Sequence, residues 1–569
     1  MQPYATLVSR VQLRRHGDRV TERGLPPLVS LCTLPSDDVT ISSNVPLGFP
    51  RLPGPGSPEH IHLLEEWIRH CDGHHQCLDY GESPTFLPTR LLDIGQSGSQ
   101  RCRLICDTTP LVKANTRYLA LSHRWGTPPK HGECDPMRGK IDRTFQRNID
   151  RLVLGIPDSD LPPKYQDAVA VSRSLRIRYI WIDSLCIIQH DKNDPLDEDQ
   201  GRDFVKEAEK MEQVFRSAYV TLAASCASSP AEHFLKPRPT RLSATLRTAE
   251  NACYFASEAI DDFYHDVEQG HLMTRGWVFQ ERVLSRRTIF FTQKQTYWEC
   301  GEGICCETLT RVKNPKSSLL GAANFPQSFP THEPAKIVAL YQSLYERYSR
   351  LKLSYPADRP SAIRGLETRL LRFLDTSGGC GVLDKYLHPG LLWQRSADKV
   401  TRIDFSSSGR HQPPSWSWMA YDGPIMYMVA GPALESELVG WSRDVAAPRW
   451  GGADHLEGEM AELSLALPAT VRGIIPDLGQ NAARRAFFDD PGRSFAGSEG
   501  SFKCVVVGST KPSANDGPRG PIFYALIVVR TRVNGAGEYG NSYYQRAGVA
   551  KLRKHQMVWH EPAEQAYII

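Results

Sequence analysis

The chain has 569 residues, which is too long for one hydrophobic core and predicts roughly two to four domains. Its apolar content of 40% and charged content of 23% are those of an ordinary globular protein, and no apolar run is long enough to span a membrane. The net charge is only +4, so composition gives no electrostatic reason to expect binding to nucleic acid or to an anionic membrane.

The N-terminal residues 1–58 are rich in proline and glycine and show little periodicity, which predicts a flexible segment. Residues 1–20 contain arginines but lack the apolar core of a secretion signal. We therefore expect a cytoplasmic protein, in which the 14 cysteines stay reduced and many are buried.

An accessory helix is predicted over 60–71, followed by a short strand around 90–95. Two groups of potential metal ligands lie at the end of this helix and much further along the chain. They are His70, Cys71, His74, His75 and Cys77 in the first group, and Cys300, Cys305 and Cys306 in the second. Neither group has paired C-x-x-C units at zinc spacing, so the sequence favours no metal site and a helix end packed with histidines and a thiol.

Strands and helices alternate between residues 116 and 225. Short apolar runs predict buried strands at YLALS (118–122), YIWID (179–183) and YVTLAAS (219–225). Three helices are predicted between these strands. The first is indicated by the spacing of Phe145, Ile149 and Leu152, the second begins after Pro162-Pro163, and the third covers 203–218. This alternation predicts βαβ units and a mostly parallel sheet that is buried on both faces.

The helix over 203–218 carries one apolar stripe. Its members are Phe204, Ala208, Met211, Phe215 and Ala218. Glu207 lies roughly 60° from the centre of this stripe, at the edge of the face that should be buried. A carboxylate in that position is either a structural anion, paired with Lys206 or Lys210, or a functional group.

Each of the three strands ends on a polar residue: Ser122, Asp183 and Ser225. In open α/β sheets, ligands bind outside the carboxyl ends of the strands. We therefore expect Ser122 and Asp183 to lie on one rim of the sheet. The alternative is that these residues are polar only because strand ends meet water.

The second half of the chain changes character from helical to β-rich. We expect an irregular insertion over 226–270, a turn, short helix and strand over 274–291, and a partner strand at TYWEC (296–300). Helices are predicted near 334–350 and 361–375, and strands at 462–467, 503–508 and 523–529, with a mobile loop over 492–501. The predicted organisation is a flexible segment (1–58), an α/β domain (59–300), a helical extension (301–412) and a β-rich region (413–569).

Several of these blocks resemble, in order, the motifs of the fungal heterokaryon incompatibility (HET) domain family. They are YLALSHRWG (118–126), YIWIDSLCIIQHD (179–191), residues 203–225 and TRGWVFQERVLSRR (274–287). Further blocks at 348–366, 390–395 and 413–424 resemble the downstream region of full-length HET proteins. The resemblance covers about 60–424, and it is the order of the motifs that makes it specific.

The resemblance implies a role in nonself recognition and programmed cell death in fungi. The HET domain has been likened to the Toll/interleukin-1 receptor (TIR) fold, so we expect a flavodoxin/TIR-like α/β sheet with helical additions, followed by a β-rich C-terminal region. Some TIR domains cleave the glycosidic bond of NAD, which makes NAD a candidate substrate and leaves no cofactor implied. The rival hypothesis is a non-enzymatic signalling module that acts through self-association and unknown protein partners.

If the domain cleaves NAD, it needs a carboxylate near the ribose to stabilise the developing oxocarbenium charge. The comparison with the family's acidic helix position selects Glu207 as the catalytic candidate. Glu281 is a rival carboxylate, although pairing with Arg282 or Arg286 is favoured. No G-x-G-x-x-G, P-loop or G-x-S-x-G pattern is present, so no ordinary dinucleotide fold, P-loop or serine hydrolase is implied.

Four further residues are candidates for binding the substrate. Asp183 and Ser122, on the predicted rim, would accept or donate hydrogen bonds to ribose hydroxyls. Trp125 would stack on a nicotinamide or adenine ring, although a tryptophan is more often part of the core. Arg124 would reach a phosphate.

Overall fold

The computed structural model divides into two compact units, Met1–Phe325 and Pro326–Ile569, which are described separately. It describes residues 13–16, 19–22, 27–34, 47–75, 77, 86–112, 116–126, 137–191, 201–247, 253–312, 333–397, 400–406, 412–429, 434–436, 467–474, 486–489, 502–510, 521–531, 542–553 and 558–568. The predicted loop over 492–501 lies outside these residues. No helix in the described ranges combines the length and the apolar character needed to cross a membrane.

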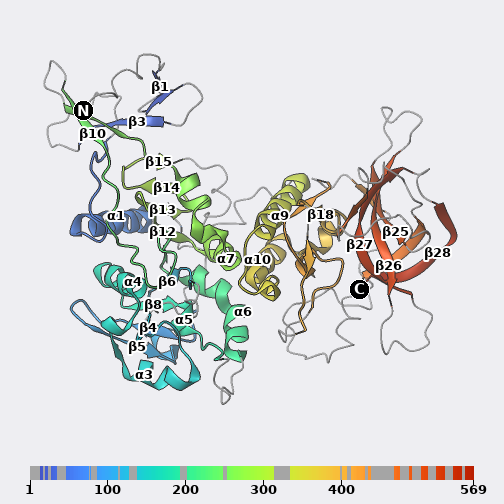
Figure 1. The fold of residues 1–569 in the computed structure, drawn as a ribbon, viewed down its shortest axis with the longest axis horizontal. Coiled ribbons are helices and arrows are strands. Elements are labelled where there is room, and N and C mark those ends of the chain that lie inside the picture. Colours follow the sequence, from blue (N-terminus) through green and yellow to red (C-terminus); the bar gives the residue numbers. More distant parts are fainter. Residues whose placement is uncertain are drawn as a thin grey trace. The chain divides into compact units, whose positions relative to one another are not determined.

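The first unit is built on a ten-stranded sheet with the order β15-β14-β13-β12-β9-β6-β8-β4-β5-β7 (Figure 1). Its strands are β4 (Leu91–Asp93), β5 (Arg101–Ile105), β6 (Tyr118–Ser122), β7 (Ile156–Pro157), β8 (Tyr179–Ile182), β9 (Val220–Ala223), β12 (Arg287–Phe291), β13 (Thr296–Cys300), β14 (Gly303–Cys306) and β15 (Arg311–Val312). The central strands are buried along their whole length, as their continuous apolar runs predict.

This sheet is mixed, and not mostly parallel as the alternating pattern predicted. Only β12, β9, β6 and β8 pair in parallel, while the strands on either side of these four pair antiparallel. The reason lies in the connections: β12, β13 and β14 follow one another through short turns, and short turns join antiparallel strands. A parallel pair needs a crossover of a dozen or more residues, and the four central strands are joined by crossovers of that kind.

Helices fill the crossovers between the four parallel strands. They are α3 (Ile149–Leu154) and α4 (Pro163–Ser174) before β8, α5 (Asp183–Cys186) and α6 (Arg202–Ser217) before β9, and α7 (Gly276–Leu284) before β12; the short α2 (Thr109–Val112) precedes β6. Figure 1 shows α4 on one side of the sheet and α6 and α7 on the other. Along the chain, β8 is added on one side of β6, and β9 and β12 are then added on the other side. The point where this order of addition reverses lies between the neighbours β6 and β9.

Helix α6 follows the predicted apolar stripe. Met211, Phe215 and Ala218 are buried in the main core of the unit, and the ring of Phe215 packs edge-on against Trp181 of β8. At the start of the helix, Phe204 is half-buried and packs against Trp277 of α7. The stripe therefore fixes α6 against both the sheet and the neighbouring helix.

A second sheet of five antiparallel strands has the order β1-β2-β3-β11-β10. It joins β1 (Leu13–His16), β2 (Arg19–Glu22) and β3 (Pro27–Cys32) with the hairpin β10 (Ser243–Arg247) and β11 (Cys253–Glu258). The insertion predicted as irregular thus contains a hairpin, and part of the segment predicted as flexible forms strands. All five residues of β10 are exposed, and the alternation of Ala244 and Leu246 with polar residues is too short to stand out in the sequence.

Helix α1 (Pro58–His74) extends the predicted accessory helix by a few residues at each end. Ser57 caps it by accepting a hydrogen bond from the backbone N–H of His60, and Pro58 occupies the first turn, where its missing N–H costs nothing. One face of α1, including Leu64, Ile68 and Cys71, is buried in the main core.

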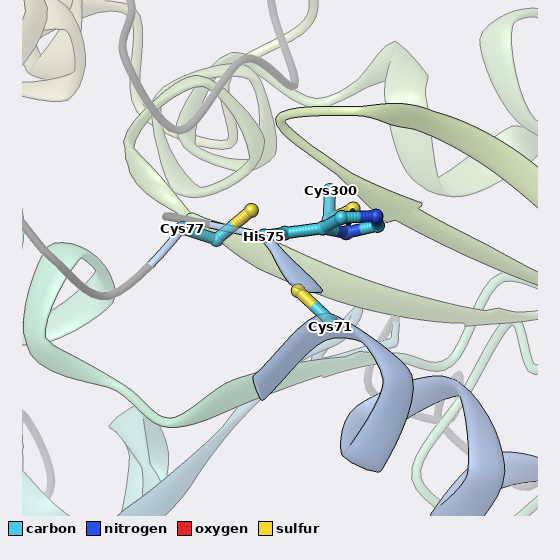
Figure 2. A group of neighbouring side chains, drawn as sticks. All are labelled: Cys71, His75, Cys77 and Cys300. Carbon is cyan, nitrogen blue, oxygen red and sulfur yellow. Dashed lines mark hydrogen bonds between the residues drawn. The ribbon is translucent and has the colours of Figure 1, made fainter. Parts of the chain in front are cut away.

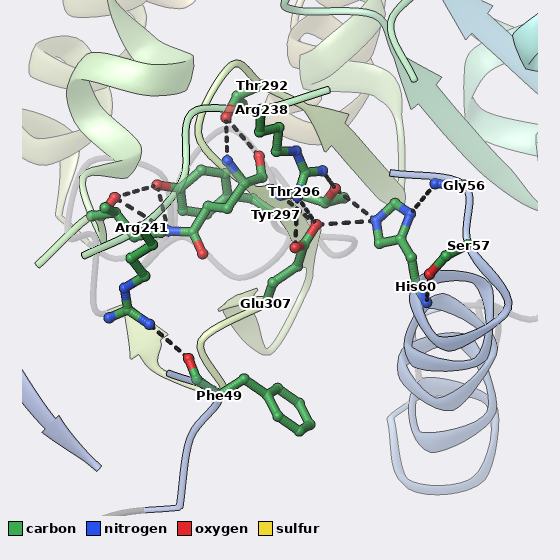
Figure 3. A network of polar contacts seen from close by, with 12 residues as sticks. Phe49, Gly56, Ser57, His60, Arg238, Arg241, Thr292, Thr296, Tyr297 and Glu307 are labelled. Carbon is green, nitrogen blue, oxygen red and sulfur yellow. Dashed lines mark hydrogen bonds and ion pairs between the residues drawn. The ribbon is translucent and has the colours of Figure 1, made fainter. Parts of the chain in front are cut away.

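The start of α1 is fixed by a buried ionic network around Glu307 (Figure 3). His60 Nε2 lies 3.0 Å from Glu307 Oε1, and Arg238 Nη1 lies 2.7 Å from Glu307 Oε2. The Gly56 N–H donates to His60 Nδ1, so the ring carries its proton on Nε2, facing Glu307. Burial alone would raise the pKa of Glu307, but the hydrogen bond from His60 and the charge of Arg238 outweigh it and lower the pKa to about 2.

The second unit combines α9 (Pro334–Ser349), α10 (Arg364–Leu374) and α11 (Leu387–Leu391) with strands. Three pairs are short: β16 (Gly378–Gly379) with β17 (Val382–Leu383), β18 (Trp393–Arg395) with β21 (Ile425–Tyr427), and β19 (Thr401–Arg402) with β20 (Tyr421–Asp422). The large sheet contains β22 (Leu434–Ser436), β23 (Leu467–Ile474), β24 (Ala486–Phe488), β25 (Phe502–Thr510), β26 (Ile522–Thr531), β27 (Ser542–Arg553) and β28 (Val558–Ile568). The C-terminal region is therefore β-rich, as predicted.

The large sheet closes on itself. β25 pairs with β26, β26 with β27, β27 with β28, β28 with β23, and β23 again with β25. Alternate residues of β25 enter different apolar clusters: Val505 and Val507 pack with Trp416, while Cys504 and Val506 pack with Phe523. Because both faces of β25 are buried, its sequence contains consecutive apolar residues instead of an alternation of apolar and polar ones.

Candidate functional site

Ser122 and Asp183 lie on the same rim of the sheet, at the carboxyl ends of neighbouring parallel strands. Leu121 of β6 pairs with Ile182 of β8, so the residues that follow them stand side by side. Ser122 is also opposite Ala223 of β9. The rim between β6 and β9 is the point where the chain reverses direction, which is where α/β sheets bind ligands.

The rim holds a carboxylate from α7. The Ser122 hydroxyl donates a hydrogen bond of 2.5 Å to Glu281 Oε2, and both side chains are buried. Burial, together with the nearby negative charge of Asp183, raises the pKa of Glu281 to about 8, although the Ser122 hydrogen bond and the charge of Arg275 oppose the rise. Glu281 therefore carries a proton at neutral pH in the free protein.

Asp183 is the second carboxylate of the rim. Its Oδ2 accepts a 2.7 Å hydrogen bond from Trp125 Nε1, and its Oδ1 accepts one from the backbone N–H of Ser184. Burial raises the pKa of Asp183, and these hydrogen bonds together with Arg275 limit the rise. The side chain is 18% exposed, so Asp183 is the carboxylate through which this group reaches solvent.

His123, which follows Ser122, was not singled out in the sequence. Its ring is buried, Nε2 lies 3.0 Å from the Tyr165 hydroxyl, and Nδ1 lies 3.6 Å from Asp183 Oδ1. Burial lowers its pKa well below the usual range, and the charges of Lys164 and Arg275 lower it further, so the ring is neutral. Its position directly after a strand that ends on the rim is the signal that could have identified it.

Cations surround the rim. Arg275, which precedes α7, donates to the backbone carbonyl of His123 at 2.9 Å. Lys164 of α4 is fully buried and donates to the carbonyl of Arg124, and burial lowers its pKa to about 7. The Arg124 guanidinium contacts the ring of His271, and in the described part of the chain no carboxylate lies within ion-pair distance of it.

Ser225 contributes a polar atom without a partner. Its Oγ is buried and makes no hydrogen bond within the described residues. It lies two residues after the end of β9, at the same end of the sheet as Ser122. A buried hydroxyl without a partner costs free energy, and a ligand that binds at this rim would satisfy it.

Glu207 has different partners from those of the rim carboxylates. It is buried, and its Oε1 accepts hydrogen bonds from Thr89 Oγ1 at 2.8 Å and from Lys210 Nζ at 2.9 Å. Pairing with Lys210 was the structural alternative that the sequence left open. Of the five candidate site residues, Ser122, Asp183 and Trp125 thus belong to one connected group, Arg124 borders it, and Glu207 has separate contacts.

One group of side chains in the described ranges has the composition of a metal site: Cys71, His75, Cys77 and Cys300. Cys300 is the register partner of Arg287, the first residue of β12. The group therefore lies at the edge where the parallel strands begin, opposite the rim that carries Ser122.

A comparison with protein families identifies the class of domain that carries the rim. Residues 118–281 match the model of the family described as heterokaryon incompatibility protein (HET). The match begins at β6 and ends at Glu281, so it includes every residue of the rim described above. No curated protein and no solved structure matches this chain. The resemblance to the HET family is thus confirmed for residues 118–281, the part of the chain that carries the rim.

Proposed function

We propose that this protein is a cytosolic effector of fungal nonself recognition and cell death, and that its rim site hydrolyses the N-glycosidic bond of NAD. The observation that carries the proposal is a pair of carboxyl groups, the buried Glu281 and the partly exposed Asp183, at the reversal point of the parallel strands. The order of the four parallel strands, 2-1-3-4 when numbered along the chain, is also that of flavodoxin-like folds and supports the TIR-like assignment.

The reaction separates nicotinamide from ADP-ribose. The bond between C1 of the ribose and the nicotinamide nitrogen breaks, and its electron pair neutralises the positive charge of the ring. Water attacks C1 and releases a proton to solvent. Because nicotinamide leaves as a neutral molecule, the site needs no strong general acid; it needs negative charge near the oxocarbenium-like transition state.

In this scheme Glu281 supplies the charge. It is protonated in the free protein, and the cationic nicotinamide ring favours its ionised form when the substrate binds. Asp183 accepts a ribose hydroxyl, and Ser122 holds Glu281 in position through its hydrogen bond. Trp125, which is held by Asp183, offers a ring face, and Arg124 offers a cation for the phosphates.

Glu281 is a stronger candidate than Glu207 because of its surroundings. Glu207 is neutralised by Lys210, which lies 2.9 Å away, so its charge is already balanced within α6. No cation lies within ion-pair distance of Glu281 in the described part of the chain, and the charge of Asp183 acts on it directly. An ionised Glu281 is therefore available to a cationic substrate.

The test is nicotinamide release from NAD by the purified full-length protein, at high protein concentration or with a crowding agent because TIR-like enzymes can require assembly. We expect Glu281→Gln to lower the rate by about 100-fold or more, as loss of a stabilising charge does. The matched control is Glu207→Gln, which should change it little. Glutamine has the shape of the protonated glutamic acid, so the variant should keep its fold, which circular dichroism checks.

Two results would contradict the proposal. Nicotinamide release that survives Glu281→Gln but is lost in Glu207→Gln would transfer the catalytic role to α6. No release by the wild-type protein under any assembly condition would favour the rival function, a signalling module that acts by self-association.

A further inference from the structure

The fold brings together two cysteine-containing groups that are far apart in the sequence. Cys71 lies in the last turn of α1, and His75 and Cys77 follow the end of that helix. Cys300 is the last residue of β13. Figure 2 shows the four side chains converging from the helix end, the segment after it and the strand.

The separations of the ligand atoms are those of a small closed site. The three Sγ atoms and the His75 nitrogen all lie within 4.8 Å of one another, and His75 Nδ1 lies 3.5 Å from Cys300 Sγ. In a tetrahedral zinc site with Zn–S bonds of about 2.3 Å, two sulfurs are about 3.8 Å apart, and a sulfur and a nitrogen about 3.5 Å. Small side-chain adjustments therefore suffice to enclose an ion.

The donor set selects the metal. Three thiolates and one imidazole suit zinc, whereas calcium and magnesium require oxygen ligands. All three cysteines are almost completely buried. Because the protein supplies all four ligands, no position is left for water or substrate, which is the mark of a structural site.

A buried arginine next to the group supports the same conclusion. Arg287 is the register partner of Cys300, so their side chains lie on the same face of adjacent strands. Its Nη2 pairs with Asp72 at 2.6 Å, but its buried Nε and Nη1 have no hydrogen-bond partner in the described ranges. Three thiolates around Zn²⁺ carry one net negative charge, and N–H donors beside such sulfurs stabilise metal thiolates.

We propose that Cys71, His75, Cys77 and Cys300 bind one structural Zn²⁺ ion, with Arg287 as the buried cation that balances the site. Zinc binding would join the C-terminal end of α1 to the end of β13. Since His60 and Glu307 already join the start of α1 to the region around Thr296, both ends of the helix would then be fastened to the same strand.

The direct experiment measures the metal content of the full-length protein after purification without chelators, by inductively coupled plasma mass spectrometry. We expect about one zinc per chain, and a loss of most of it in Cys300→Ser and in His75→Ala. The matched controls are Cys305→Ser and His74→Ala, which change neighbouring residues of the same types outside the group and should keep the zinc.

A second measurement does not depend on the folding of a variant. Replacing zinc by Co²⁺ in the wild-type protein should produce the intense visible absorption of a tetrahedral thiolate site. Wild-type protein that contains no zinc and acquires none when zinc is added would overturn the proposal. A disulfide between Cys71 and Cys77, found by mass spectrometry of the non-reduced protein, would also refute it, as would equal loss of metal in the controls.

Discussion

At the scale of single residues, the main feature of the rim is that two carboxyl groups are shielded from water. Glu281 and Asp183 both have raised pKa values because the protein shields their carboxyl groups from water, and the charge of Arg275 opposes the rise in both. Their hydrogen-bond donors are neutral groups, Ser122 and Trp125. Neutral donors position a carboxyl group without cancelling its charge, which keeps that charge available to a ligand.

This arrangement predicts the pH dependence of NAD cleavage. The kcat/KM value reports ionisation in the free protein, where the pKa of Glu281 is about 8. Because the ionised form is the active one, kcat/KM should rise about tenfold per pH unit below pH 8 and become constant above it. The measurement is the initial rate of nicotinamide release between pH 6 and pH 9. A rate that falls as the pH rises through 8 would show that Glu281 acts as an acid instead.

At the scale of elements, α1 is fastened along β13. His60 meets Thr296 at one end of the strand, and Cys71 meets Cys300 at the other. Eleven helical steps from His60 to Cys71 span about 16 Å, and the four steps of the strand span about 14 Å, so the two elements match in length. The helix can therefore be held at both ends without bending.

The ionic network at the start of α1 predicts a loss of stability in acid. The pKa of Glu307 is about 2 in the folded protein and near 4.5 in the unfolded chain. A lowered carboxylate pKa stabilises the folded state above the unfolded value, by about 3 kcal/mol here, and this contribution disappears as the pH falls from about 5 to about 2. Urea denaturation across that range should show the decline in the free energy of unfolding.

The matched variants for this measurement are Glu307→Gln and Glu66→Gln. Glu307→Gln should destabilise the protein at pH 7 by about 3–5 kcal/mol, because it leaves Arg238 buried without its counterion, and should flatten the acid decline. Glu66 is an exposed carboxylate of the same helix, so Glu66→Gln should leave both unchanged. An acid decline of equal size in both variants would contradict the assignment to Glu307.

The same elements show how far a sequence can be interpreted. The runs YLALS and TYWEC coincide with β6 and β13, because strands buried on both faces are short and mostly apolar. The hairpin β10–β11 was missed because β10 is short and fully exposed and β11 is only partly buried, so neither strand forms a long apolar run. The hydrogen bond between Ser122 and Glu281 and the meeting of Cys77 with Cys300 could not be predicted, because tertiary structure alone brings residues so far apart in the chain together.

At the scale of the whole molecule, the two units have separate cores. Phe215 belongs to the core of the first unit and Leu526 to that of the second. Part of the predicted helical extension (301–412) shares an apolar cluster with the C-terminal strands: Leu391 of α11 packs in the same cluster as Leu526 of β26. The helical and β-rich parts of the second unit therefore form one body.

Separate cores predict two transitions in calorimetry of the full-length protein. Phe215→Ala should lower the melting temperature of one transition and Leu526→Ala that of the other, because each removes a buried side chain at a cost of about 2–5 kcal/mol. A single transition that both variants shift equally would indicate that the units unfold together.

The closed sheet of the second unit also bears on aggregation. A strand at the edge of a sheet presents unpaired backbone N–H and C=O groups, which can recruit a strand from another molecule. β23, β25, β26, β27 and β28 each have a neighbour on both sides. In the part of the chain that the structure describes, the strands richest in valine and isoleucine, β25 and β26, have paired neighbours along most of both edges, whereas β28 meets β27 only at its C-terminal end. Ring closure therefore protects the most amyloid-like sequence of the molecule from pairing with other copies.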